Sequence, residues 1–170
     1  MNNGFRFGLW AAVLSVLYIT VLYVSAPTYL ITGYERLTLL IFLVLMGIAA
    51  YTEREQRPDG FIEFGELLKM TFRVYVIGFF AKFLFIYVLF NYIDTDMIEL
   101  VKDAQVRIFI ENKGIDVPEE IFQQKLKLFI ESTHFGPTLL DFLGISLEII
   151  VGAIFAGTIS FFFKREAPEY

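Results

Sequence analysis

Three ionisable residues lie inside long apolar segments, and they are the side chains of this sequence that are best placed to do chemistry: Lys82, Asp141 and Glu148. A lysine at the centre of a bilayer costs about 2.5–3.5 kcal/mol on insertion scales, so it needs a compensating partner. Lys82 falls near the middle of one apolar segment and Glu148 deep within a later, antiparallel one, so we predict that they pair. Asp141 precedes Glu148 by seven residues and lies on the same helix face. The group predicts either a structural ion pair or a polar path for a proton or an ion.

Four apolar segments position these charges, at about residues 7–29, 36–52, 74–93 and 138–163. About 20 apolar residues, at 1.5 Å each, cross a hydrocarbon core of about 30 Å. The hydrophobic fraction of the chain is 56%, above the roughly 45–50% of soluble domains. Lipid cannot satisfy backbone hydrogen bonds, so each crossing must be a helix. The predicted fold class is all-α: one transmembrane domain, residues 1–170, forming an integral membrane four-helix bundle.

Two connecting segments carry amphipathic patterns of their own. Residues 61–75 repeat apolar side chains at helical spacing, and we interpret them as an interfacial elbow before the third span. Residues 94–136 contain a possible cap at Asp94-Thr95 and a second helix start at Pro118-Glu119-Glu120. This pattern predicts an extramembrane helical hairpin inserted between transmembrane helices 3 and 4.

The distribution of basic residues predicts the orientation. Four crossings place both termini and the loop after residue 52 on one side, where seven Lys and Arg residues occur. In the 94–136 insertion, five basic residues are diluted among nine carboxylates. The positive-inside rule therefore predicts cytoplasmic termini. We expect a multi-pass protein of the bacterial inner (cytoplasmic) membrane with residues 94–136 in the periplasm.

Small residues mark the helix faces at which close packing is expected. Gly144, Gly152 and Ala156 share a face with Glu148, and Gly4 and Gly8 share one at the start of the first span. Faces of this kind let two helix backbones approach each other in lipid. We interpret them as contacts within the bundle, with self-association or a foreign helix as the alternatives.

Several function classes are disfavoured by what the sequence lacks. It has no cysteine and a single histidine, and it contains no nucleophile–base arrangement, glycine-rich phosphate loop or metal-ligand spacing. We therefore expect no enzyme activity, no catalytic or metal site and no cofactor. The net charge of -5 and the pI of about 4.9 provide no basic stripe for a phosphate backbone, so nucleic acid is not an expected partner.

The order of features resembles an uncharacterised family of small four-span bacterial inner-membrane proteins, known only as a domain-of-unknown-function family. The resemblance covers nearly the whole chain. It is carried by Asn3–Gly8, by Phe61–Lys69, by Tyr92-Ile93-Asp94 and by Phe163-Lys164-Arg165. It implies an inner-membrane protein with a helical insertion between spans three and four, and it implies no activity or catalytic residue.

Two functional hypotheses follow from these patterns. A third is also open, but no feature of the sequence distinguishes it from the other two. The leading one is an accessory or scaffold subunit that docks to a larger membrane protein complex, so that its partners are the lipid bilayer and another membrane protein or a second copy of itself. The alternative is a small oligomeric transporter or channel that uses Lys82, Asp141 and Glu148. The third is sensing of membrane stress or of lipid through the periplasmic hairpin.

Overall fold

Helices make up nearly all of the described chain. A computed structural model describes residues 2–25, 27, 30, 33–58, 61–112, 118–132 and 142–165, without the side chains of residues 142–146. Its helices are α1 (Asn3–Ser25), η1 (Tyr34–Leu37), α3 (Thr38–Glu55), α4 (Phe64–Val88), the π-helical turn η2 (Leu89–Ile93), α5 (Asp96–Glu111), α6 (Glu119–Ser132) and α7 (Phe142–Phe163). Within these described residues, the backbones of Ile62 and Arg165 pair in a single antiparallel β-bridge.

Three helical segments are long and apolar enough to cross a membrane: Asn3–Ser25, Tyr34–Glu55 and Phe64–Ile93, with mean hydropathies of 2.1, 1.6 and 1.9 in their most apolar windows. Only 28% of the residues in each window are buried inside the protein, so most of each surface faces outward. A helix that is apolar all round needs lipid or a large core to cover it. The prediction of an all-helical chain is therefore confirmed for the described residues, and three of the helices are long and apolar enough to span a membrane, while α7 has a shorter apolar stretch, Leu147–Phe163.

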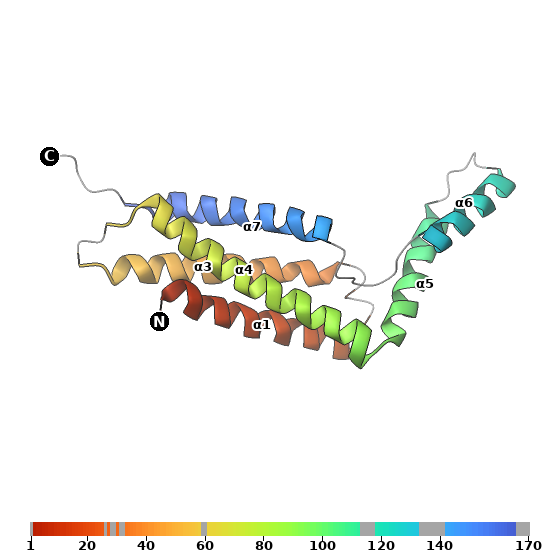
Figure 1. Cartoon of the computed structure of the whole chain (residues 1–170), viewed down its shortest axis with the longest axis horizontal. Coiled ribbons are helices and arrows are strands. Elements are labelled where there is room, and N and C mark those ends of the chain that lie inside the picture. The colour runs from red at the N-terminus through yellow and green to blue at the C-terminus, as the bar shows by residue number, and fades with distance from the viewer. Residues whose placement is uncertain are drawn as a thin grey trace.

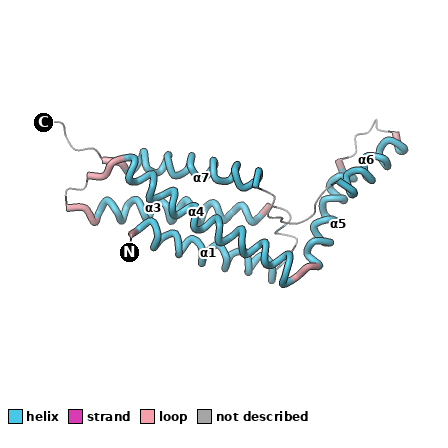
Figure 2. Tube along the Cα trace, in the orientation of Figure 1, coloured by secondary structure: helices cyan, strands magenta, loops and turns pink. Residues whose placement is uncertain are grey.

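Helices α1, α3, α4 and α7 lie alongside one another, and α5 and α6 project beyond one end of them (Figure 1). Asn3 contacts Glu53 and Ile62 pairs with Arg165, so the start of α1, the end of α3, the start of α4 and the end of α7 meet at the same end. We call this the terminal end and the opposite one the hairpin end. The described loop residues next to α1, α3, α4 and α7 lie at these two ends (Figure 2). Helices α1 and α4 thus run parallel, and α3 and α7 run antiparallel to them.

The contact between α1 and α4 depends on small residues. A Cβ atom added at Gly4 would lie 2.9 Å from the backbone oxygen of Met70, and one at Gly8 would lie 2.7 Å from Cδ1 of Ile77. Farther along, the Ser15 hydroxyl lies 3.5 Å from the carbonyl oxygen of Gly78. The two helix backbones are therefore in close contact over three turns, which larger side chains would prevent.

An aromatic cluster fills the space where α1, α3 and α4 meet α7. Phe42 packs edge-on against Tyr75 with ring centroids 5.4 Å apart, and Tyr75 stacks on Phe79 at 5.9 Å. A Cβ atom at Gly78 would lie 2.6 Å from Cε1 of Phe42 and 2.8 Å from Cβ of Ala11. The absence of a side chain at Gly78 is what lets the three helices converge on this cluster.

The segment interpreted as a separate elbow is part of α4. Helix α4 begins at Phe64 and continues to Val88 without a break. Its first turns already bury Leu67, Met70 and Thr71. Burial against the neighbouring helices keeps this amphipathic stretch in line with the rest of α4, whereas an interfacial elbow would turn away along the membrane surface.

The first turns of α5 are fixed to the hairpin end. Met97 and Val101 are buried in a small cluster with Leu89 and Phe90 of η2. The Tyr23 hydroxyl, near the end of α1, donates a hydrogen bond of 2.7 Å to the Asp94 carboxylate. Asp94 therefore ties the base of the hairpin to α1, although the sequence pattern had suggested that it caps α5.

Candidate functional site

A polar contact between α4 and α7 contains one of the predicted intramembrane charges. Tyr75 is fully buried, and its ring covers Gly152 so closely that no Cβ atom would fit between them. Its hydroxyl donates to the backbone carbonyl of Glu148 at 2.8 Å and lies 3.3 Å from Oε2 of the same residue. The Glu148 carboxylate is therefore placed by Tyr75, a residue that the sequence reasoning did not assign to the site.

The expected ion pair between Lys82 and Glu148 does not form in the structure. Lys82 is only 8% exposed, and its ammonium lies 5.6 Å from the centroid of the Phe79 ring. Gly152 of α7 contacts Tyr75 of α4, and this contact gives a common reference level. Glu148 is four residues from Gly152 toward the hairpin end, and Lys82 is seven residues from Tyr75 in the same direction. At 1.5 Å per residue, Lys82 therefore lies roughly 4 Å nearer the hairpin end than Glu148. The Glu148 carboxylate lies at the hydroxyl of Tyr75, and the Lys82 ammonium lies at the Phe79 ring.

Lys82 instead lies near the level at which α3 begins. Gly78 of α4 contacts Phe42 of α3, so these two residues are at the same height. Lys82 follows Gly78 by four residues, and Thr38 precedes Phe42 by four in the antiparallel helix, so Lys82 and Thr38 are also at similar heights. Asp141, the third predicted charge, lies outside the described residues.

A second polar contact joins α4 and α7 nearer the terminal end. The hydroxyls of Thr71 and Ser160 are both buried and lie 3.1 Å apart. Ser160 also donates to the carbonyl of Ala156 at 2.6 Å, and Thr71 donates to that of Leu67 at 2.9 Å. Each hydroxyl has a backbone partner, so this pair holds the two helices in register without leaving a polar group unsatisfied.

The small residues singled out in the sequence lie at helix contacts wherever their surroundings are described. Gly4 and Gly8 face α4, Gly152 faces the Tyr75 ring, and Ala156 is fully buried beside Thr71. Gly144 lies in α7, in the stretch for which only the backbone is described. These contacts are all between helices of the same chain.

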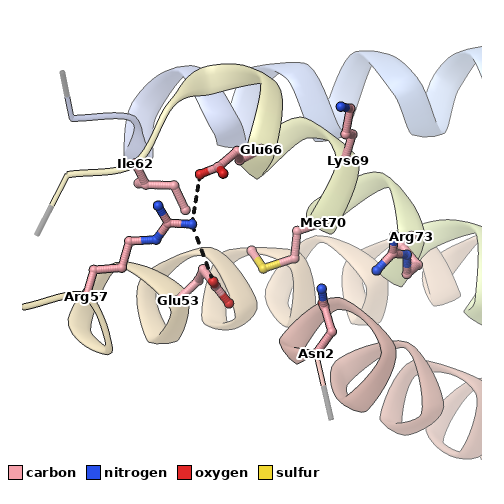
Figure 3. Close-up of a pocket in the computed structure, with 8 residues that line it drawn as sticks. All are labelled: Asn2, Glu53, Arg57, Ile62, Glu66, Lys69, Met70 and Arg73. Carbon is pink, nitrogen blue, oxygen red and sulfur yellow. Dashed lines mark ion pairs between the residues drawn. The ribbon is translucent and has the colours of Figure 1, made fainter.

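A charged pocket opens at the terminal end, between the start of α4, the end of α3 and the residue preceding α1 (Figure 3). Its volume is about 280 Å³. It is lined by three basic residues, two carboxylates, one amide and two apolar side chains: Arg57, Lys69, Arg73, Glu53, Glu66, Asn2, Ile62 and Met70. From the sequence, these basic residues were used to predict the orientation, and Lys69 and Arg73 were placed on the polar face of the amphipathic stretch before the third span. The helical spacing of Lys69 and Arg73 after the turn at Pro58 is the feature of the sequence that could have predicted this pocket.

Arg57 lies between the two carboxylates of the pocket. Its Nη2 atom is 2.8 Å from Oε2 of Glu66 and 3.8 Å from Oε1 of Glu53 (Figure 3). The amide of Asn3 donates to Oε2 of Glu53 and to Oε1 of Gln56, both at 2.8 Å. The starts of α1 and α4 and the end of α3 are thus tied into one polar network, and both carboxylates are engaged within the protein.

The fold and these contacts define a class of all-helical proteins in which at least three helices could span a membrane. Within that class, the chain belongs to the family described as "protein of unknown function (DUF4199)", whose model matches residues 6–165. The match confirms the resemblance to a domain-of-unknown-function family. No curated protein and no solved structure matches the chain.

Proposed function

We propose that the protein is a non-enzymatic accessory or scaffold subunit of the bacterial inner membrane, which docks to a larger membrane protein through the hairpin formed by α5 and α6. In this proposal α1, α3, α4 and α7 are four membrane spans, and the hairpin is an extramembrane insertion between the third and the fourth. The observation that carries the proposal is the projection of α5 and α6 beyond the other helices with apolar side chains left exposed (Figure 1).

The hairpin has a small core of its own and an uncovered apolar surface. Phe109 of α5 stacks on Phe129 and Phe122 of α6, with ring centroids 4.6 and 5.9 Å away. Ile121 and Leu128 lie two turns apart on one face of α6 and are 47% and 63% exposed. An exposed apolar pair held on a formed helix is typical of a protein contact.

The charge of the hairpin favours a protein partner over the lipid surface. Helix α5 carries four carboxylates and two basic residues, and α6 carries three carboxylates and two basic residues. Amphipathic helices that lie on anionic membranes are rich in Lys and Arg on their polar face. The acidic face of this hairpin would be repelled by such a surface, which leaves its apolar side chains available to a protein.

The proposed orientation places both termini in the cytoplasm and residues 94–136 in the periplasm. The chain contains no cysteine, so single-cysteine variants can be labelled without background. Gln124→Cys on α6 is expected to react with a membrane-impermeant maleimide in intact cells. Gln56→Cys at the terminal end is expected to react only after permeabilisation. The reverse pattern would contradict the orientation.

Copurification with crosslinking tests the docking role. A photo-crosslinking residue at position 124 is expected to capture a membrane protein in native membranes. Ile121→Asn combined with Leu128→Asn should abolish the capture, because it removes the exposed apolar pair, while the matched polar change Gln123→Asn should retain it. Recovery of this chain alone at every expression level, or capture that survives the double substitution, would contradict docking through this face.

A second candidate, a small oligomeric transporter or channel, is favoured by the burial of Lys82 without an ion pair to Glu148. A cation held in this way between membrane-spanning helices could take part in moving a proton or an ion, together with Asp141 and Glu148. Flux through liposomes containing the purified protein tests it. The candidate predicts loss of flux in Glu148→Gln and Lys82→Met, and it fails if flux is indifferent to both.

A further inference from the structure

The pocket at the terminal end has basic residues that its own carboxylates do not neutralise. Glu53 and Glu66 both contact Arg57, and Glu53 also accepts a hydrogen bond from Asn3. Lys69 and Arg73 lie one helical turn apart on α4 and are exposed, and neither forms an ion pair with a carboxylate in the described part of the chain. With three basic residues against two acids, the pocket offers a net positive site that is open to an anion.

The length of α4 places this pocket at the level of lipid headgroups. The continuous helical segment Phe64–Ile93 has 30 residues and is roughly 45 Å long at 1.5 Å per residue. A hydrocarbon core is about 30 Å thick, so about ten residues of the segment lie outside it. The charged residues among them are at its start, where Glu66, Lys69 and Arg73 are found.

The same face of α4 continues as an apolar stripe toward the membrane centre. Phe80 and Leu84 follow Lys69 by 11 and 15 residues, which returns them to its helix face, and they are 47% and 59% exposed. From Arg73 to Leu84 the helix rises roughly 16 Å, close to half of a hydrocarbon core. A cationic site followed by an exposed apolar stripe of this length matches the dimensions of a phospholipid.

We propose that this pocket binds an anionic phospholipid, with the phosphate group at Lys69 and Arg73 and an acyl chain along Phe80 and Leu84. The ammonium and the guanidinium donate hydrogen bonds to phosphate oxygens, and both side chains bind phosphate in this way in other proteins. Ile62 and Met70 form the apolar wall beneath the phosphate. The site is independent of the proposed docking role, because it lies at the opposite end of the helices from the hairpin.

Native mass spectrometry of the purified full chain tests the site. The protein in mild detergent is given equal amounts of phosphatidylglycerol and phosphatidylcholine, and retained lipid is counted per chain. Wild-type protein should retain phosphatidylglycerol in preference, and Lys69→Gln combined with Arg73→Gln should weaken retention by more than about tenfold, a change that corresponds to 1.4 kcal/mol. The charge-conserving pair Lys69→Arg and Arg73→Lys should retain most of the binding.

The matched control is Arg6→Gln combined with Arg54→Gln, which removes the exposed Arg6 and the half-buried Arg54 from the terminal end without changing a residue that lines the pocket. This control should bind lipid like the wild type, and equal loss in both double variants would overturn the proposal. Binding of inorganic phosphate in phosphatidylcholine nanodiscs, without retention of phosphatidylglycerol, would also overturn it, because the ligand would then be a free anion. Circular dichroism checks the folding of each variant, which is expected because Arg6, Lys69 and Arg73 are exposed and Arg54 is only half-buried.

Discussion

The fit of Tyr75 against Gly152 makes Gly152→Ala a sharp test of the contact between α4 and α7. A methyl group at position 152 would overlap Cε1 and Cδ1 of the Tyr75 ring and would lie 2.7 Å from Cγ. The ring cannot simply turn aside, because it is fully buried between Phe42 and Phe79. Either the aromatic cluster must rearrange or α7 must move away from α4.

Both responses have a cost that can be worked out. Inserting a methyl group into a packed core costs about 1–3 kcal/mol. If α7 moves, the contact of Tyr75 with Glu148 and that of Thr71 with Ser160 are also weakened. Hydrogen bonds between membrane helices contribute about 0.6 kcal/mol on average and at most about 1.7. We therefore expect Gly152→Ala to lower the free energy of unfolding by about 2–4 kcal/mol, most of it from packing.

Gly157→Ala on the same helix is the matched control, because a Cβ atom at Gly157 would have no neighbour within 4 Å. Reversible unfolding in mixed micelles, followed by circular dichroism as a denaturing detergent is added, measures both variants. Gly157→Ala should be neutral or slightly stabilising, since alanine is the better helix former. Equal stabilities of the two variants would refute the packing argument.

A double-mutant cycle separates the clash from other effects of the substitution. Tyr75→Ala removes the ring and leaves a cavity, and on its own it should cost several kcal/mol, about 3–5 for a large aromatic. In the presence of Tyr75→Ala the Gly152→Ala methyl group has room. The loss of stability in the double variant should therefore be smaller than the sum of the losses in the two single variants. Strict additivity would show that the methyl group and the ring do not meet.

Three further changes have defined outcomes. Lys82→Met should leave stability unchanged or raise it, because the desolvation cost of a buried ammonium is removed and no ion pair with Glu148 is lost; a loss like the roughly 3–5 kcal/mol of a broken buried pair would contradict this. Tyr75→Phe should cost only about 0.6 kcal/mol, and at most about 1.7, in the same unfolding assay. Phe109→Ala should open the hairpin, so that trypsin cleaves faster at Lys125 than in wild type, whereas Ile108→Ala, an exposed neighbour, should not change the rate.

The helices that are long and apolar enough to span a membrane could be predicted from the sequence because lipid imposes one simple rule. A run of about 20 apolar residues without charge, such as the one in α1, has few structural alternatives in a bilayer. The ends of the helices are less determined. Helix α4 extends back to Phe64 because Leu67 and Met70 bury against its neighbours, and this depends on tertiary contacts that the amphipathic pattern alone does not define.

The details of the site depended on heights and side-chain directions that the sequence does not give. Lys82 and Glu148 were expected to pair because their segments overlap in depth, but the Glu148 carboxylate lies at the hydroxyl of Tyr75 and the Lys82 ammonium at the ring of Phe79. The terminal-end pocket brings Arg57 to Glu66 across a loop and Asn3 to Glu53 over 50 residues of chain. Spacing along one helix can predict a shared face, but it cannot predict such contacts between helices.

The parallel arrangement of α1 and α4 has a consequence for how the chain is made. In the proposed topology, two parallel spans cannot enter a bilayer together as one hairpin, because the intervening α3 must first return the chain to the starting side. Until α4 is made, the face of α1 that carries Gly4 and Gly8 has no partner on α4. This glycine-lined contact would therefore form only after the third of these helices has been synthesised, and a chain that stops before Phe64 would leave that face of α1 uncovered by α4.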